Sequence, residues 1–259
     1  MLQVDLAVIG GTGVYRTDML VKAKEVEYET VYGKANLVIG SYHDRSVAFL
    51  NRHGKGHSVP PHLVNYRANI QALKELRAKR IIATAAVGSL NEKMGPQDFV
   101  LVDQFLDFTK VRKTTFHEGR PHGVVHVDVT DPYCREMREY IFEKAVAQGI
   151  RVHQGGCYVC TEGPRFETPA EIKMFKMLGG DVVGMTSVPE VILAREAMLC
   201  YATICMVTNY AAGISPSVLS HQEVLDEMKI MSDSISALIM TVLETIPLEA
   251  GCSCRHEVQ

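Results

Sequence analysis

The 259-residue sequence lacks a strong net charge, a long apolar run and a basic leader, and each absence excludes a class of protein. With 27 Lys and Arg against 30 Asp and Glu, the net charge of -3 gives no electrostatic footprint for nucleic-acid binding. The longest apolar stretch, residues 191–207, is interrupted by Arg195 and Glu196 and is too broken to span a membrane. The opening MLQVDLAVIGG contains Asp5 and indicates a first strand rather than a signal peptide. We expect a soluble, cytoplasmic protein with no nucleic-acid or membrane partner.

The seven cysteines do not form a recognisable metal-binding pattern. Cys157 and Cys160 make a C-x-x-C pair, but no second pair stands at zinc-finger spacing, so we expect no metal site. Cys252 and Cys254 form a C-x-C motif in a short C-terminal tail at about residues 250–259. Three forms of this motif stay open: a local disulfide, which a hot habitat would favour, a redox-sensitive tail, or two free thiols. Buried thiols in a reducing compartment explain the cysteines in or beside apolar stretches: Cys134, Cys157, Cys160, Cys200 and Cys205.

Apolar runs and helical spacings alternate along the chain without a repeat or a linker. The runs typical of strands are residues 4–9, 36–40, 46–51, 80–87, 99–103, 156–161, 181–185 and 201–209. Helical spacing covers residues 64–78, 132–148, 169–178, 189–197 and 221–245. This alternation predicts an α/β sandwich around a mixed or parallel sheet. We expect residues 1–259 to form a single domain, because no change in composition divides the chain.

A glycine turn follows the first predicted strand, at Gly10-Gly11-Thr12-Gly13. A dinucleotide-binding loop would need a glycine where the chain has Arg16, and the lysine of a nucleotide-triphosphate loop is absent. The turn can still present backbone N–H groups and the Thr12 hydroxyl to a small anion. A tight turn that needs only glycine backbone angles is the simpler interpretation.

Donor groups gather in residues 51–57, NRHGKGH, directly after an apolar strand. Arg52 therefore stands at a strand end, where open α/β sheets bind ligands. Its guanidinium fork suits phosphate oxygens, and His53 adds a donor. A solvated basic loop is the alternative. A metal site at His53 and His57 lacks a carboxylate or Cys ligand beside it.

Three further strand ends carry polar or aromatic groups. In residues 161–168, TEGPRFET, the hydroxyl of Thr168 before a proline is typical of a helix start, while Phe166 can stack on a flat heterocycle and Glu167 can accept N–H groups. Polar residues also follow the strands that end near residues 185 and 208. Together the five strand ends predict a small-molecule site along one edge of the sheet. The chain contains no serine nucleophile elbow, metal cluster or cofactor lysine motif, so we expect no cofactor.

The order of these motifs resembles the trimeric nucleoside phosphorylases, which include methylthioadenosine phosphorylases and low-molecular-mass purine nucleoside phosphorylases. The resemblance covers about residues 4–247 and rests on IGGTG at 9–13, RHGKGH at 52–57, VNYRANIQALK at 64–74, TEGPRFET at 161–168, GMTSVPE at 184–190 and TNYAAG at 208–213. It implies a three-layer sandwich with a central mixed β-sheet flanked by helices. It also implies phosphorolysis of a purine nucleoside, with inorganic phosphate as co-substrate and without metal or cofactor.

The resemblance assigns roles to individual residues. Asn209 and His53 are the expected catalytic residues, and Met185 is expected beneath the ribose. His126 resembles a residue that a neighbouring subunit lends to the site, which implies a homotrimer or a dimer of trimers. Ala85 stands where the methylthioadenosine branch has threonine, so it can offer only its backbone N–H. The expected phosphate-binding set is Thr12, Arg52, His53, Ala85, Ala86 and Thr186. The remaining expected contacts to the nucleoside are Phe166, Glu167, Tyr210, Ala211 and His221.

Departures from the methylthioadenosine branch indicate the substrate. Asn209 and Ala211 replace the aspartates of that branch, and an amide can both donate to a 6-oxo oxygen and engage N7. Glu167 resembles the glutamate of purine nucleoside phosphorylases and suits the N1–H of a 6-oxopurine. His221 matches a histidine near the 5′-hydroxyl. We expect inosine and guanosine as substrates. Methylthioinosine, methylthioadenosine and a non-catalytic nucleoside-binding module are the alternatives.

Overall fold

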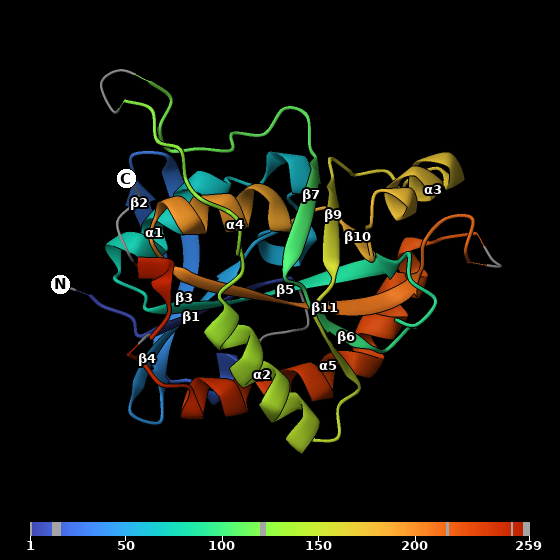
Figure 1. The fold of residues 1–259 in the computed structure, drawn as a ribbon. Coiled ribbons are helices and arrows are strands. Elements are labelled where there is room, and N and C mark those ends of the chain that lie inside the picture. Colours follow the sequence, from blue (N-terminus) through green and yellow to red (C-terminus); the bar gives the residue numbers. More distant parts are fainter. Residues whose placement is uncertain (1, 12–16, 120–122, 216–217, 250, 256–259) are drawn as a thin grey trace.

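The computed structural model describes residues 2–11, 17–119, 123–215, 218–249 and 251–255. Figure 1 shows helices packed around a twisted central sheet. The strands are β1 Leu6–Gly10, β2 Val21–Thr30, β3 Gly33–Tyr42, β4 Arg45–Asn51, β5 Arg80–Ser89, β6 Phe99–Leu101, β7 Gln104–Phe108, β8 Val152–Gln154, β9 Cys157–Thr161, β10 Val182–Gly184 and β11 Cys200–Tyr210. The α-helices are α1 Tyr66–Glu75, α2 Arg135–Ala147, α3 Pro169–Met177, α4 Ser187–Glu196 and α5 His221–Thr245. Short 3-10 helices are Thr17–Met19, Lys55–His57, Pro61–Leu63 and Ser253–Arg255.

Strand β5 is the centre of the sheet. The main order is β2-β3-β4-β1-β5-β10-β9-β7, and β11 pairs with β5 and with β6, which in turn pairs with β8. Pairing of β1 with β5 is parallel and runs as far as Ala83, whereas β10 pairs antiparallel with Gly88 and Ser89. Residues 84–87 therefore lie where β5 passes from one neighbour to the other. We call this stretch the β5 fork.

Helices cover both faces of the sheet and produce three layers (Figure 1). Helices α1 and α4 bury Ile70, Leu73 and Val191 against one face. Helices α2 and α5 bury Ile141 and Leu238 against the other, and the closing helix spans the residues expected from its spacing. The fold is thus the α/β sandwich with a mixed sheet that the resemblance implied. Helix α3 lies at the edge over a smaller cluster.

The elements that the apolar pattern did not reveal are β2, β7 and β8. All three are edge strands, at the two ends of the main order and at the end of the β6 branch. Strand β2 is mostly exposed, and β7 and β8 are only partly buried. An edge strand needs one covered face at most, so it carries no continuous apolar run from which it could be recognised.

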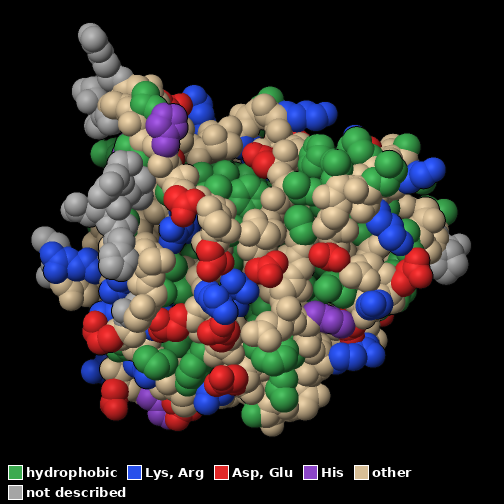
Figure 2. All heavy atoms as spheres, viewed as in Figure 1, with side chains coloured by type: hydrophobic (Ala, Val, Ile, Leu, Met, Phe, Trp, Pro, Cys, Tyr) green, Lys and Arg blue, Asp and Glu red, His purple; other side chains and the backbone are tan. Residues whose placement is uncertain are grey.

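The face shown in Figure 2 mixes positive and negative side chains, as the near-neutral composition predicts. Apolar side chains gather at its upper right. Exposed apolar residues of α3 and the turn after it include Met174, Met177 and Leu178. Within the described ranges, no helix combines the length and hydropathy needed to cross a bilayer.

Candidate active site

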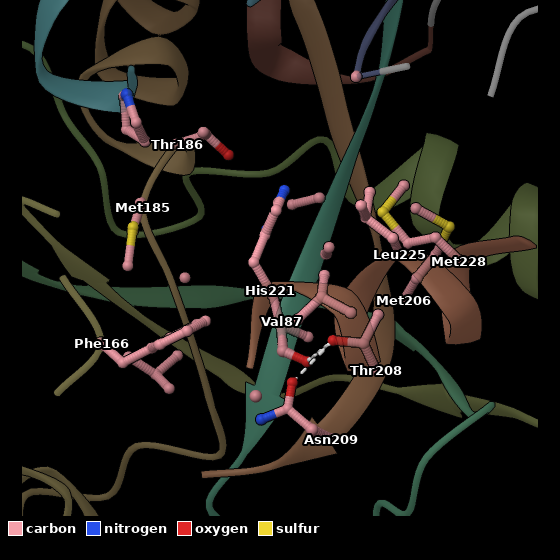
Figure 3. A pocket seen from close by; sticks show the side chains of 18 of the residues that line it. Val87, Phe166, Met185, Thr186, Met206, Thr208, Asn209, His221, Leu225 and Met228 are labelled. Carbon is pink, nitrogen blue, oxygen red and sulfur yellow. Dashed lines mark hydrogen bonds between the residues drawn. The ribbon is translucent and has the colours of Figure 1, made fainter. Parts of the chain in front are cut away.

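A cavity of about 460 Å³ opens at the β5 fork. Its walls come from the ends of β5, β10 and β11, the loops after β4 and β9, and the first turns of α5. In Figure 3, Phe166 and Met185 face Met206, Leu225 and Met228 across the space. The expected site residues that line it are Arg52, His53, Ala85, Ala86, Phe166, Glu167, Met185, Thr186, Asn209, Ala211 and His221.

At one end of the cavity, Arg52 is buried in a bidentate ion pair with Glu190. Nε of Arg52 donates to Oε2 and Nη2 donates to Oε1, each at 2.7 Å. Nη1 donates to the carbonyl of Thr84 at 3.0 Å. Burial opposes the charge of Arg52, but Glu190 outweighs burial and raises the pKa of the guanidinium. Two N–H groups of the five remain for a ligand, and the cation is held in one orientation.

Glu190 was not recognised from the sequence, although it ends the motif GMTSVPE. Its side chain is fully buried in α4, and Oε1 also accepts a hydrogen bond from Tyr201 at 2.8 Å. Tyr201 in turn accepts from Thr203 at 3.1 Å. A carboxylate directly before the apolar run of residues 191–194 was the available signal, because a buried charge requires a partner.

One ring nitrogen of His53 is bonded to the backbone at this end of the cavity, and the other is left for a ligand. Its Nδ1 lies 2.9 Å from the carbonyl of Val59, and a carbonyl can bond only to an N–H. Burial, followed by the charge of Arg52, lowers the pKa of His53 to about 4. The ring is therefore neutral at pH 7 with its proton on Nδ1, so Nε2 offers a lone pair.

Thr186 is the N-cap residue of α4, shortly after the end of β10, and it is buried in the wall of the cavity. Its backbone N–H donates to the hydroxyl of Tyr158 at 3.3 Å. Gly184 lets this tyrosine approach, because a Cβ there would lie 2.1 Å from the hydroxyl oxygen. Thr84 also lines the cavity, and its hydroxyl has no hydrogen-bond partner among the described residues. The sequence did not single out Thr84.

At the other end of the cavity, the amide of Asn209 has a fixed orientation (Figure 3). Nδ2 donates to the carbonyl of Tyr210, and Oδ1 accepts from the hydroxyl of Thr208, both at 2.8 Å. The carbonyl of Tyr210 can only accept, so the amide atom of Asn209 that faces it must be the nitrogen. One N–H and one lone pair of the amide remain for a ligand.

Glu167 and Phe166 complete this second end. Glu167 is buried, and its Oε1 accepts from the hydroxyl of Thr161 at 2.7 Å. Burial raises the pKa of Glu167, and the hydrogen bond from Thr161 opposes the rise. Thr168 begins α3 with a capping box to Glu171, as its position before Pro169 predicted, and this fixes the adjacent Glu167 at the helix start.

Arg112 holds two of the cavity loops together and was not recognised from the sequence. Nη1 donates to the carbonyls of Met185 and Val188, each at 2.7 Å, and Nη2 donates to those of Thr161 and Glu162 at 3.1 and 2.7 Å. Its side chain is almost fully buried. One guanidinium thus fixes the strand ends of β9 and β10 relative to each other.

The third part of the cavity lies under α5 and is mainly apolar. His221 is the first residue of this helix, and Ser220 caps it by accepting from the N–H of Glu223 at 3.1 Å. The ring of His57 stands between His53, at 4.3 Å, and His221, at 6.1 Å. The apolar residues around His221 are Leu219, Val224, Leu225 and Met228.

Three expected site residues are not among the described residues that line the cavity. Thr12 lies outside the described residues. The hydroxyl of Tyr210 lies beside Gly95, and the residue does not line the cavity. His126 is exposed on the long connection between β7 and α2.

A family model described as the phosphorylase superfamily matches residues 5–244. The chain belongs to the phosphorylase superfamily. A superfamily member named "Probable 6-oxopurine nucleoside phosphorylase", from Moorella thermoacetica, is 55% identical over 96% of this chain and 96% of its own length. Another, "Probable S-methyl-5'-thioinosine phosphorylase" from Methanothermobacter thermautotrophicus, is 48% identical over 98% of this chain and 89% of its own. The fold matches methylthioadenosine phosphorylase from Schistosoma mansoni in complex with adenine, with a TM-score of 0.89 and 34% identity, over 96% and 93% of the two chains.

The first prediction concerns Glu190. Glu190→Gln keeps the shape of the side chain but leaves Arg52 buried without a counter-charge, so the free energy of unfolding should fall by about 3–5 kcal/mol. Urea unfolding followed by circular dichroism measures this change. The matched control is Glu27→Gln, which removes the exposed partner of Lys34 and should have little effect. Equal unfolding midpoints for the two variants would contradict the prediction.

Proposed function

We propose that the protein catalyses phosphorolysis of the 6-oxopurine nucleosides inosine and guanosine, giving the free base and ribose 1-phosphate in purine salvage. The observation that carries the proposal is the arrangement of one cavity: a fixed cation, Arg52, at one end and an amide and a carboxylate, Asn209 and Glu167, at the other. The separation suits a molecule with an anion at one end and a purine at the other. Membership of the superfamily and the name of the Moorella relative support it.

In the proposed reaction, phosphate attacks the anomeric carbon while the bond to the purine breaks. Arg52, Thr186 and the backbone N–H group of Ala86 hold the phosphate, together with Thr12, whereas the N–H group of Ala85 points to β11. The neutral His53 accepts the remaining proton of monohydrogen phosphate in a hydrogen bond at Nε2. The site thus offers several hydrogen-bond donors and one acceptor, His53, to the phosphate. This combination selects monohydrogen phosphate and orients its nucleophilic oxygen. The residue beneath the ribose is Met185.

Departure of the purine places negative charge on the base, and hydrogen bonds from Asn209 stabilise that charge. The remaining N–H of its amide donates to O6, while the remaining lone pair accepts from N7–H as the base gains its proton. Hydrogen bonds placed where charge develops lower the barrier most. Glu167 accepts from N1–H and, for guanine, from the 2-amino group. Phe166 stacks on the ring, and Ala211 leaves room for it.

Methylthioinosine is the second candidate substrate, and a specific feature favours it. The apolar residues around His221 would also accommodate a methylthio group, and a relative named as a methylthioinosine phosphorylase is 48% identical. Both candidates share a 6-oxopurine, so they differ only at the 5′ position. His221 decides between them in our proposal, because its ring nitrogens can bond a hydroxyl but gain little from a thioether.

We also propose that each chain acts as one domain in a cytoplasmic homotrimer or dimer of trimers, with His126 completing a neighbour's site. The exposed connection that carries His126 also exposes Val111 and Val124, and the surface near α3 exposes further apolar residues. Exposed apolar surface of this kind favours association between chains. The seven free thiols suit a reducing compartment.

The second prediction tests the base end. The wild type should cleave inosine and guanosine in phosphate buffer and not in phosphate-free buffer, with much weaker cleavage of adenosine. Asn209→Asp should lose inosine activity, because the new carboxylate faces O6 and also the carbonyl of Tyr210. Initial rates with each nucleoside measure both effects. Asn36→Asp adds the same charge on exposed β3 and is the control. Wild-type inosine activity in Asn209→Asp would remove the amide from the mechanism.

The third prediction tests the 5′ end. The wild type should prefer inosine to methylthioinosine in kcat/KM by roughly tenfold or more, since a bound thioether would cover the exposed imidazole of His221 without pairing its nitrogens, at a cost of about 1–3 kcal/mol. His221→Met should narrow or reverse this preference and leave the KM for phosphate unchanged. The control is Gln222→Met, because Gln222 bonds Asp226 on the exposed side of the helix. If the wild type prefers methylthioinosine, that nucleoside becomes the assigned substrate.

The fourth prediction tests assembly. Sedimentation equilibrium should show three or six chains, and His126→Ala should lower kcat/KM for inosine without changing that number. Adding equal amounts of inactive Arg52→Ala chains to His126→Ala chains should restore activity after subunit exchange, because some sites then combine an intact cavity with an intact histidine. A monomeric, fully active wild type would contradict the proposal.

A further inference from the structure

Four of the seven cysteines meet at one point, far apart though they are in the sequence. Cys134 immediately precedes α2, Cys200 begins β11, and Cys252 and Cys254 lie at the last 3-10 helix. All four Sγ atoms lie within 4.8 Å of one another. Three of these residues are buried, and Cys252 is half-buried. We call this group the four-cysteine cluster.

The spacing of the sulfur atoms is that of a coordination shell. Sγ of Cys252 lies 3.6 Å from that of Cys134 and 3.4 Å from that of Cys200. A disulfide needs about 2.05 Å. Zinc–sulfur bonds of about 2.3 Å in a tetrahedron place neighbouring sulfur atoms about 3.8 Å apart. The cluster is therefore close to the size that a tetrahedral ion with four thiolates requires.

A buried cation stands beside the cluster. Arg80 is fully buried, and it pairs in register with Cys200 across β5 and β11. Its Nη2 donates to Glu136 and to the carbonyl of Glu249, while Nε and Nη1 have no hydrogen-bond partner among the described residues. Zinc with four thiolates carries a net charge of -2, which a neighbouring guanidinium stabilises. Such a charge gives the three unpaired N–H groups of Arg80 a function.

We propose that Cys134, Cys200, Cys252 and Cys254 bind a structural zinc ion. Each thiol gives up its proton on binding, so the ion replaces four protons. Four protein ligands leave no coordination position for a substrate, which makes the site structural rather than catalytic. It lies at the first residue of β11, whereas Asn209 stands near the last, so the proposal is independent of the proposed function.

The zinc fastens the C-terminal segment to the body of the protein. Other contacts already hold this segment close: Glu136 accepts from the N–H of Gly251 at 2.8 Å, and Arg255 donates to the carbonyl of Lys79 at 2.8 Å. These polar contacts bring Cys252 and Cys254 to the start of α2. Of the three forms left open for the C-x-C motif, the structure has the two free thiols, with Cys254 buried and Cys252 half-buried.

The test begins with metal content. Wild type purified with reductant, exposed to zinc and dialysed against a weak chelator should retain about one zinc per chain by mass spectrometry of the metal. Cys252→Ser should lower this content by roughly tenfold or more and lower the melting temperature. The matched control is Cys157→Ser, which changes another half-buried cysteine outside the cluster and should keep the zinc. Activity on nucleosides should be unchanged in both variants at low temperature.

A second measurement uses only the wild type, in case a variant fails to fold. Replacement of zinc by Co²⁺ should produce the intense visible absorption of tetrahedral cobalt with thiolate ligands. Three results would overturn the proposal. The first is a protein mass that is lower by four hydrogen atoms with no bound metal, which means two disulfides. The second is that the four thiols of the cluster react freely in zinc-exposed protein. The third is an equal zinc content in Cys252→Ser and Cys157→Ser.

Discussion

The ion pair between Arg52 and Glu190 is the interaction on which the cavity depends. A guanidinium at the bottom of a 460 Å³ cavity cannot be desolvated alone, so the protein supplies a carboxylate from α4 and a carbonyl from β5. Both partners of the pair are almost completely buried. The cation is therefore fixed in one orientation, and burial followed by its charge lowers the pKa of the neighbouring His53. One buried pair thus places a fixed positive charge at this end of the cavity and adds to the effect of burial on the imidazole.

The β5 fork provides the space, and Arg112 fixes its shape. Because β1 stops pairing at Ala83 and β10 begins at Gly88, residues 84–87 are open to the cavity on that edge of β5, while their other edge stays paired with β11. The strand ends of β9 and β10 then need an anchor, which the four carbonyl contacts of Arg112 supply. The arrangement follows a general rule of α/β proteins, in which ligands bind where the connectivity of the sheet changes direction.

Most of the fold and the outline of the site could be predicted from the sequence, because buried strands are apolar and polar residues follow where they end. The missing parts depend on contacts that no local pattern encodes. The role of Glu190 depends on its ion pair with Arg52, which lies 138 positions earlier in the chain. Arg112 lies in an irregular connection. The local sequence of His53 also does not reveal that its Nδ1 is bonded to a carbonyl six residues away. Tyr210 was expected in the site, but its hydroxyl lies beside Gly95, a contact that no local pattern encodes.

The long helix α5 divides into two parts with different partners. Its buried residues begin at Met231, whereas none of residues 221–230 is fully buried. Those of this first part that line the cavity are His221, Val224, Leu225 and Met228. The part from Met231 onward therefore contributes most of the stability that the helix gives to the fold. The part before it shapes the cavity under the helix. Substitutions in residues 221–230 can change what this end of the cavity accepts at little cost in stability. Members of a family with this fold can therefore come to differ in the 5′ group that they accept through substitutions in the first three turns of this one helix. The end of the cavity that contains Arg52 can stay the same.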